Sequence, residues 1–328
     1  MLVMKKICTW IMAGLLACVA LPVCAQDYSM SNHNVVPFSL NPASVGAANT
    51  LRLGINYRMQ WPKLGNNYHT VRVSYDQNVY RQMCSVGAAY SYDQMSPAFG
   101  SHQFDVVYAH TFRCAEKHFI RLGLQGSVFL HQYDPTALSY GDQWDPATGG
   151  VLPSTVERLE ANSKSLFDFS VGASYVFEHK LMVGFAVYHL AEPDNGFVPG
   201  SQRLQRKYIG QVNFVQDLKL NHGLKSQGFS DNYFFANAAY QQQGEFKQAY
   251  IGVGICYQPV ILGVAYKTDV EEVHTASFTV GGYYQGFQLY YVFDLFTSDK
   301  LNGSWSNEIS LIYTMPTKKK SLCPVVYW

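Results

Sequence analysis

The sequence contains little charge and no long apolar run in its body. Charged residues make up 14% of the chain, whereas an average soluble domain has about 25%. The formal net charge is only +1, which argues against a nucleic-acid-binding surface. After residue 25 there is no stretch of about 18 consecutive apolar residues, so spanning helices are excluded. If the protein spans a membrane, it must do so with β-strands.

The sequence also lacks the motifs of common enzymes and metal sites. It has no G-x-S-x-G, H-E-x-x-H or P-loop motif, so we predict no catalytic residue, no cofactor and no metal site. The seven cysteines form no C-x-x-C pair, which disfavours structural zinc. Three of them lie within residues 1–25, and the remaining four are Cys84, Cys114, Cys256 and Cys323.

Residues 1–25 have the features of a secretory signal peptide. Lys5 and Lys6 form a basic start, an apolar stretch follows, and small residues precede a cleavage site after Ala25. An acylated Cys24 would be the lipoprotein alternative, but the residues before it fit that motif poorly. We therefore expect export before folding.

Alternating apolar and polar residues recur along the rest of the chain. In residues 51–61 one strand face would be apolar and the other polar. The apolar face comprises Leu51, Leu53, Ile55, Tyr57, Met59 and Trp61. We count about fourteen such segments of roughly ten residues, the length that spans an outer membrane when tilted. The 24 Tyr and 26 Gly suit aromatic girdles and close strand packing.

The connections support a closed transmembrane barrel. The sequence predicts an all-β outer-membrane β-barrel over residues 51–316, with about 14 antiparallel strands and both termini periplasmic. Long loops at 132–163 and 192–205 then lie outside the cell, whereas most short turns are periplasmic. Residues 26–50 are expected to form a periplasmic lead-in, and residues 317–328 a basic periplasmic tail. A large secreted β-sandwich is the soluble alternative.

Four charged residues are predicted to face the lumen near the barrel closure. Alternation turns Arg58, Arg72, Asp294 and Glu308 inward at similar heights. Because charges inside a barrel must pair or be hydrated, we predict the ion pairs Arg58–Glu308 and Arg72–Asp294. Such a cluster would fix strand register, and a conduction or gating role is the alternative.

Two cysteines are placed at one rim of neighbouring predicted strands. Cys84 begins the third strand and Cys114 follows the fourth. Since the compartment is oxidising, Cys84–Cys114 is a candidate disulfide, and free thiols at the rim are the alternative.

Several short motifs occur in a fixed order along the chain. They are Asn41-Pro42-Ala43 with Gly46, Arg58-Met59-Gln60-Trp61, Gly141-Asp142-Gln143, His189-Leu190 with Pro193, Tyr290 to Leu295, Asn307 to Leu311, and the tail Lys318-Lys319-Lys320 with Cys323-Pro324. In these motifs the chain resembles the PorP/SprF family of outer-membrane proteins of the type IX secretion system. The matches cover nearly the whole mature chain.

The resemblance implies a barrel that works with the secretion and gliding machinery. It implies contact with periplasmic ring or peptidoglycan-binding proteins, and support for export or surface attachment of adhesin-like cargo with a C-terminal sorting domain. It also makes the basic tail, Lys318 to Lys320, a periplasmic docking segment. The lipid and lipopolysaccharide of the outer membrane would surround the barrel, and a passive, porin-like channel for small solutes is the alternative function.

Overall fold

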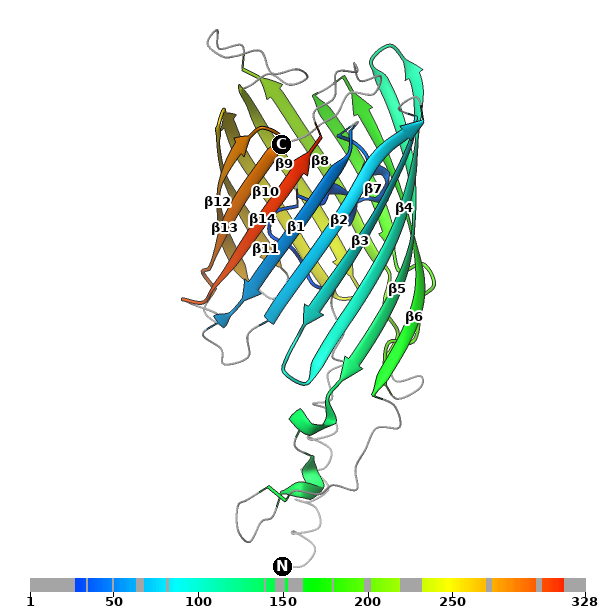
Figure 1. Cartoon of the computed structure of the whole chain (residues 1–328), viewed down its shortest axis with the longest axis vertical. Helices are drawn as coiled ribbons and strands as arrows, with labels where there is room; N and C mark the ends of the chain where they lie inside the picture. The colour runs from blue at the N-terminus through cyan, green and yellow to red at the C-terminus, as the bar shows by residue number, and fades with distance from the viewer. Residues whose placement is uncertain are drawn as a thin grey trace, which may run out of the picture.

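The computed structural model is a closed barrel of fourteen antiparallel strands (Figure 1). It describes residues 27–315, except for 34, 49, 63–67, 81–82, 139, 145–150, 153–161, 179, 198–201, 219–231, 270–272 and 299–302. Each strand pairs with its neighbours in sequence, and β1 closes the barrel on β14. The predicted fold class and strand number are confirmed.

The strands are 8 to 17 residues long. Their bounds are β1 Arg52–Gln60, β2 Tyr68–Tyr80, β3 Cys84–Gln94, β4 Phe99–Ala115, β5 His118–Tyr133, β6 Ser163–Phe177, β7 Leu181–Tyr188, β8 Lys207–Asp217, β9 Asn232–Gln243, β10 Phe246–Tyr257, β11 Val260–Asp269, β12 His274–Tyr284, β13 Phe287–Phe296 and β14 Trp305–Thr314. The short 3₁₀ helices are η1 Pro37–Ser39, η2 Pro42–Ser44, η4 Pro135–Ala137 and η5 Gly141–Gln143.

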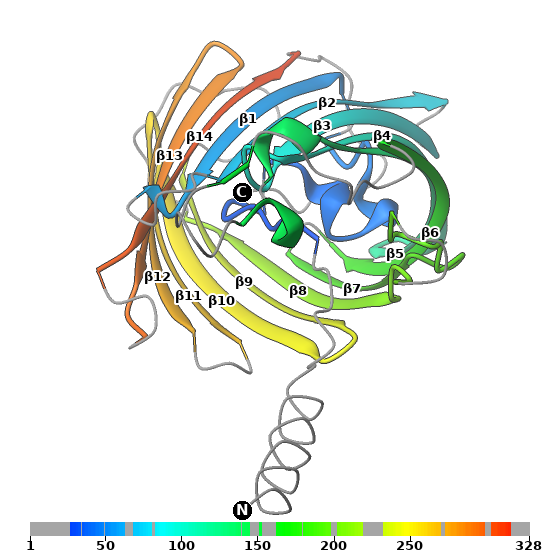
Figure 2. The same ribbon diagram turned by 90° about the horizontal axis from the view of Figure 1, so that it is seen from below.

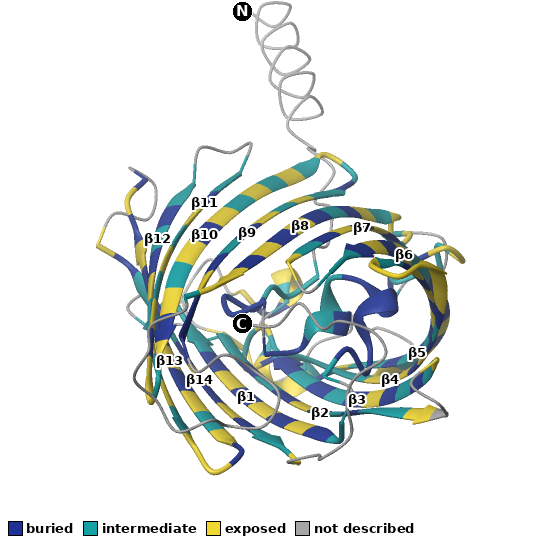
Figure 3. Cartoon of the chain, turned by 90° about the horizontal axis from the view of Figure 1, so that it is seen from above, coloured by how far each residue is buried: buried dark blue, intermediate teal, exposed yellow. Residues whose placement is uncertain are grey.

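Every strand alternates between an outward and an inward side chain. In β1, Leu53, Ile55 and Tyr57 are exposed on the outer wall, whereas Asn56 and Arg58 are buried inside. Seen along the barrel axis, the alternation appears as stripes of exposed and buried residues on each ribbon (Figure 3). An apolar outer wall around a polar interior is the arrangement that lipid requires of a barrel.

The two ends of the barrel differ in their connections. Short turns join β4 to β5, β6 to β7, β10 to β11 and β12 to β13 at one end, here called the turn-bearing end. The long β5–β6 and β7–β8 connections lie at the opposite, loop-bearing end. The long connection after β8 falls at the turn-bearing end, where the sequence also placed it.

The N-terminal segment lies inside the barrel (Figure 2). The sequence analysis expected residues 26–50 to form a periplasmic lead-in, whereas the described part of this segment lies within the barrel. Asp27 contacts Lys207 and Gln243, which pair at the loop-bearing ends of β8 and β9, whereas β1 begins at the turn-bearing end. The segment therefore crosses the lumen lengthwise. Its many polar and apolar contacts with the inner wall hold it there, and alternation in the strands does not reveal them.

Among the described residues, no helix has the length and apolar character needed to cross a membrane.

Candidate functional site

Residues 27–33 and 35–48, which we call the plug segment, lie in the lumen. The segment contains η2, for which Asn41 is the N-cap. The Asn41 side chain accepts a hydrogen bond from the N–H of Ala43 at 2.9 Å. Its Nδ2 donates to the backbone oxygens of Ala173 at 3.0 Å and Phe185 at 3.4 Å. One buried side chain thus shapes the turn and fastens it to β6 and β7.

Two glycines in the wall make room for this turn. A Cβ on Gly123 would lie 2.2 Å from the backbone nitrogen of Ala43. A Cβ on Gly172 would lie 2.0 Å from the Oδ1 of Asn41. Real Cβ atoms do not approach other atoms so closely, because atoms in a close-packed interior already sit at contact distance. Only glycine at these wall positions allows the plug segment to sit against β5 and β6.

The middle of the plug segment packs as a small hydrophobic core. Val35, Phe38 and Val45 are at most 1% exposed. Wall side chains that face the same core come from the turn-bearing half of several strands, and they include Val107, Phe119, Val176, Met182, Val215 and Ile312. Burial of apolar surface stabilises such a core by roughly 25 cal/mol per Å². This half of the lumen therefore holds an apolar core. Charged wall residues are buried beside it, because Arg52 and Arg121 donate hydrogen bonds to the backbone oxygens of Val35 and Val45, and Asp76 accepts one from the N–H of Gly46.

A buried cluster of charges lies near the loop-bearing end of β1. Arg58 pairs with Glu308 at 3.3 Å and with Asp294 at 2.9 Å. Arg58 and Glu308 are also direct neighbours in the β1–β14 register. Lys267 of β11 lies 3.8 Å from Asp294. The structure thus brings together three of the four predicted residues and adds a lysine to them.

The predicted pair between Arg72 and Asp294 is wrong. Arg72 binds Asp105 of β4 at 3.1 Å. Strands β1 and β14 separate β2 from β13, so the two predicted partners are about 14 Å apart along the wall at one strand spacing each. Asp105 lies only two strands from Arg72, and Asp294 is already compensated by Arg58 and Lys267.

The charge cluster also holds the plug segment. Glu308 accepts hydrogen bonds from the backbone N–H groups of Ser31 at 2.6 Å and Asn32 at 3.2 Å. The Ser31 hydroxyl contacts Asp294 and Arg58, and it accepts a hydrogen bond from Lys267 at 2.7 Å. We call the contacts of Ser31 and Asn32 with this cluster the clasp. Hydrogen bonds to charged groups are about twice as strong as neutral ones, so the clasp is a firm attachment.

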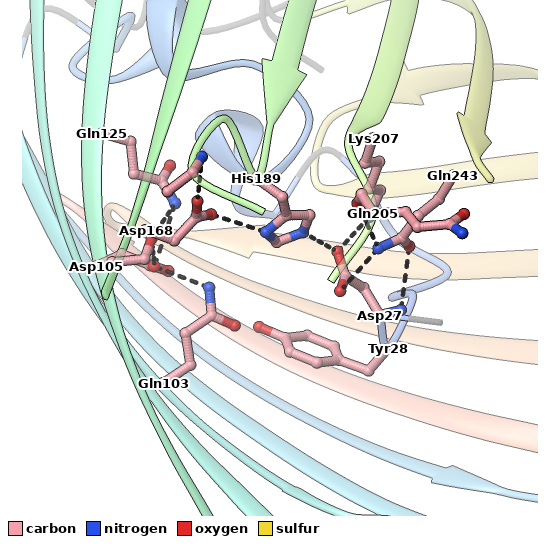
Figure 4. Close-up of polar contacts among 12 residues, drawn as sticks. Asp27, Tyr28, Gln103, Asp105, Gln125, Asp168, His189, Gln205, Lys207 and Gln243 are labelled. Atoms are coloured by element: carbon pink, nitrogen blue, oxygen red, sulfur yellow. Dashed lines mark hydrogen bonds and ion pairs between the residues drawn. The ribbon is translucent and has the colours of Figure 1, made fainter. Parts of the chain in front are cut away.

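The first described residue is held by a second charged group (Figure 4). His189 lies between two carboxylates, with Nε2 2.8 Å from Asp27 and Nδ1 2.8 Å from Asp168. Lys207 lies 3.2 Å from Asp27. Burial alone would lower the pKa of His189, but the two carboxylates outweigh it and raise the pKa to about 9. Burial likewise favours neutral Asp27, yet His189 and Lys207 lower its pKa below the usual range.

The candidate disulfide between Cys84 and Cys114 is wrong, because both thiols are free. Cys84 pairs with His110 in the β3–β4 register, and β4 continues to Ala115. Cys114 is thus four residues farther along its strand, about 13 Å away at the usual rise. Cysteines more than about 7 Å apart at Cα cannot form a bridge without backbone movement.

The other motif residues lie at the loop-bearing end. Trp61 follows Gln60, the last residue of β1, and packs edge-on against Tyr68 with ring centroids 5.2 Å apart. Gly141 and Asp142 form η5 in the β5–β6 connection. The backbone oxygen of Pro193 accepts a hydrogen bond from Leu204, which closes the β7–β8 connection.

The backbone is strained at two of these motifs. Trp61 and His189 have positive φ angles of 51° and 59°, which residues with a Cβ rarely adopt. Such strain persists only where surrounding contacts enforce it, and it is frequent at functional sites. For His189 those contacts are the two carboxylates described above.

Two further expectations concern the basic tail and metal binding. The tail with Lys318, Lys319 and Lys320 lies outside the described residues. Within the described part of the chain, no group of three or more His, Cys, Asp or Glu side chains is placed to hold a metal ion.

Sequence reasoning missed most of the buried charged residues that line the lumen. Asp105, Asp168 and Lys267 are inward positions of predicted strands, so a complete reading of alternation would have found them. Ser31 and Asp27 carry no such signal, because they lie in a segment without periodicity. Their role follows only from the path of the plug segment through the lumen.

The family comparison covers almost all of the chain. The model of the type IX secretion system membrane protein PorP/SprF matches residues 23–313. The chain belongs to the PorP/SprF family. The match includes the plug segment, the Asn41 turn and all described strands except the last residue of β14. In this PorP/SprF barrel, the N-terminal motif fills the lumen and the His189 motif holds the start of the plug segment.

No curated protein matches the sequence. Among solved structures, the chain is similar to the Acinetobacter baumannii outer membrane protein Omp33, with 7% identity, a TM-score of 0.48 and coverage of 81% of this chain and 98% of that one. A Pseudomonas aeruginosa FadL homologue shows 13% identity, a TM-score of 0.45 and coverage of 84% and 92%. At these values the likenesses carry no functional information. With the family match, the barrel is a multi-pass protein of the outer membrane.

Proposed function

We propose that this barrel is an outer-membrane component of the type IX secretion and gliding machinery. In this role it supports export or surface attachment of adhesin-like cargo that carries a C-terminal sorting domain. The observation that carries the proposal is the family match over residues 23–313. The filled lumen agrees with a structural or docking role, because the plug segment occupies the space that a passive porin keeps open.

The two ends of the barrel suit different partners. We propose that the turn-bearing end faces the periplasm, since short periplasmic turns and long outer loops are the outer-membrane pattern. Both chain termini were expected on the periplasmic side, and we keep this proposal for the tail that follows β14. Its lysines, Lys318 to Lys320, would dock on periplasmic ring or peptidoglycan-binding proteins. Cargo would meet the loops of the opposite end.

A gentle detergent pull-down of the tagged protein from outer membranes, followed by mass spectrometry, tests the proposal. Periplasmic machinery proteins or a sorting-domain adhesin should be recovered with it. Replacing Lys318, Lys319 and Lys320 together by Gln should remove the periplasmic partners and leave the cargo, whereas the same three changes to Arg should keep both. A barrel recovered without any partner would favour the passive channel instead.

A further inference from the structure

The plug segment matches the wall chemically along its whole length. Its polar start meets the charged, loop-bearing half of the lumen, where Arg58, Arg72 and Lys207 lie. Its middle meets the turn-bearing half, where apolar wall side chains pack on it and Arg52, Arg121 and Asp76 bond its backbone. The segment therefore blocks the lumen through polar contacts at its start and through apolar packing and hydrogen bonds at its middle.

The clasp is one of several attachments of the segment to charged wall residues, since Arg52, Arg121 and Asp76 bond its backbone farther along. Glu308 is 1% exposed, and two of its hydrogen-bond donors are backbone N–H groups of the plug segment. Arg58 remains beside Glu308 when the segment is absent, because both belong to the wall. The clasp can thus open without leaving an unpaired buried carboxylate, which would be strongly unfavourable.

A further attachment joins the segment to a loop. Asp27 binds His189, which follows the last residue of β7 and begins the long β7–β8 connection. This connection lies at the loop-bearing end, and His189 at its start has a strained backbone conformation. A change in the connection therefore acts directly on the start of the plug segment.

A cavity of about 130 Å³ remains beside the segment in the loop-bearing half. Tyr28 of the plug segment and the wall residues Gln125 and Ser170 line it. The Oε1 of Gln125 and the Oγ of Ser170 are buried and have no protein partner, in residues that are 5% and 2% exposed. Because a water molecule occupies about 30 Å³ and seeks such partners, this space suits about four waters. This cavity beside the plug segment, which we call the vestibule, can therefore hold water.

We propose that the barrel is a latent pore for small hydrophilic ions, that the plug segment is its gate, and that the clasp is the latch. Release removes Val35, Phe38 and Val45 from the turn-bearing half and leaves the wall charges of both halves in place. The path then runs from the vestibule to the turn-bearing end. This activity is separate from partner binding in secretion, so neither proposal depends on the other.

Ion conductance of the purified full-length protein in planar lipid bilayers tests the gate. The wild type should show no channel openings, because the plug segment then occupies the lumen. Glu308→Gln should raise the frequency of channel openings about tenfold or more, since an amide replaces the charged acceptor of two hydrogen bonds. Glu178→Gln is the matched control, because Glu178 pairs only with rim lysines, and it should stay silent.

A tethered variant separates gate opening from general loosening of the barrel. A Cβ on Gly87 would lie 2.4 Å from the Cγ2 of Val45, so cysteines at these two positions are within disulfide reach. In the Glu308→Gln background, with the native cysteines replaced by serine, this tether should silence the channel until a reductant is added. Openings that persist in the oxidised tether would overturn the proposal.

Thiol labelling gives a readout that does not need current. Met30 is 7% exposed in the plug segment, so Met30→Cys should be protected from a water-soluble maleimide in the wild-type background. It should be labelled at least about tenfold faster with Glu308→Gln, matching the change in opening. Heat-modifiable migration on a gel verifies that each variant is a folded barrel. Folded Glu308→Gln that is both silent and protected would show that the segment is a permanent part of the core.

Discussion

Asn41 and Gly172 occupy adjoining space, because the Oδ1 of Asn41 fills the position that a Cβ on Gly172 would take, 2.0 Å away. The same asparagine donates to the backbone oxygen of Ala173, the next residue of β6. The N-terminal motif of the family therefore packs directly against a glycine of the wall. This contact turns an irregular segment into a fitted part of the barrel.

Gly123→Ala should destabilise the seat of the plug segment. The added methyl group would lie 2.2 Å from the backbone of Ala43, which cannot move aside as a flexible side chain would. We expect a loss of about 1–3 kcal/mol, the usual cost of overpacking, in the free energy of unfolding measured with urea in lipid vesicles. Gly126→Ala is the control on the same strand, because its Cβ would meet nothing within 4 Å. Equal losses in both variants would refute a specific contact.

Arg58→Gln should be among the most damaging single changes in the wall. It leaves Glu308 without a cation and Asp294 with only Lys267 at 3.8 Å. Removing one partner of a buried ion pair typically costs about 3–5 kcal/mol. Urea unfolding in vesicles measures the change. Lys117→Gln breaks an exposed ion pair at the rim and should leave the midpoint unchanged.

The His189 attachment should depend on pH. Its pKa is about 9 in the folded protein and 6.5 for a free histidine, so folding favours the protonated form. The resulting stabilisation is complete below about pH 6.5 and disappears as the pH rises through about 9. The stability difference between the wild type and His189→Gln should therefore shrink over this range in urea unfolding. A difference that is constant from pH 6 to pH 10 would contradict a charged contact with Asp27.

The described cysteines should react with a maleimide in the order of their exposure. Cys114 is exposed, Cys84 is half-buried and Cys256 is 3% exposed. Cys114 should be labelled first in the folded protein, and Cys256 only after unfolding. Mass spectrometry of peptides from non-reduced protein measures the order. A pair of Cys84 and Cys114 that resists alkylation until reduction would contradict the free thiols.

The sequence by itself determined the barrel. The alternation around Leu53, Ile55 and Tyr57 requires two faces with different surroundings, and this requirement repeated about fourteen times leaves few other folds. Alternation also placed Arg58 and Glu308 inward at one height. Their contact followed, because neighbouring strands of a closed barrel fix which inward residues lie side by side.

Only the tertiary structure decided which residues meet across more than one strand and what fills the lumen. Arg72 had two carboxylates at suitable heights, and the number of intervening strands selected Asp105 over Asp294. The plug segment has no periodicity because each of its residues meets a different part of the wall, so its contacts are set by the shape of the lumen. For that reason Ser31 and Asp27 show their roles only once the closed barrel surrounds them.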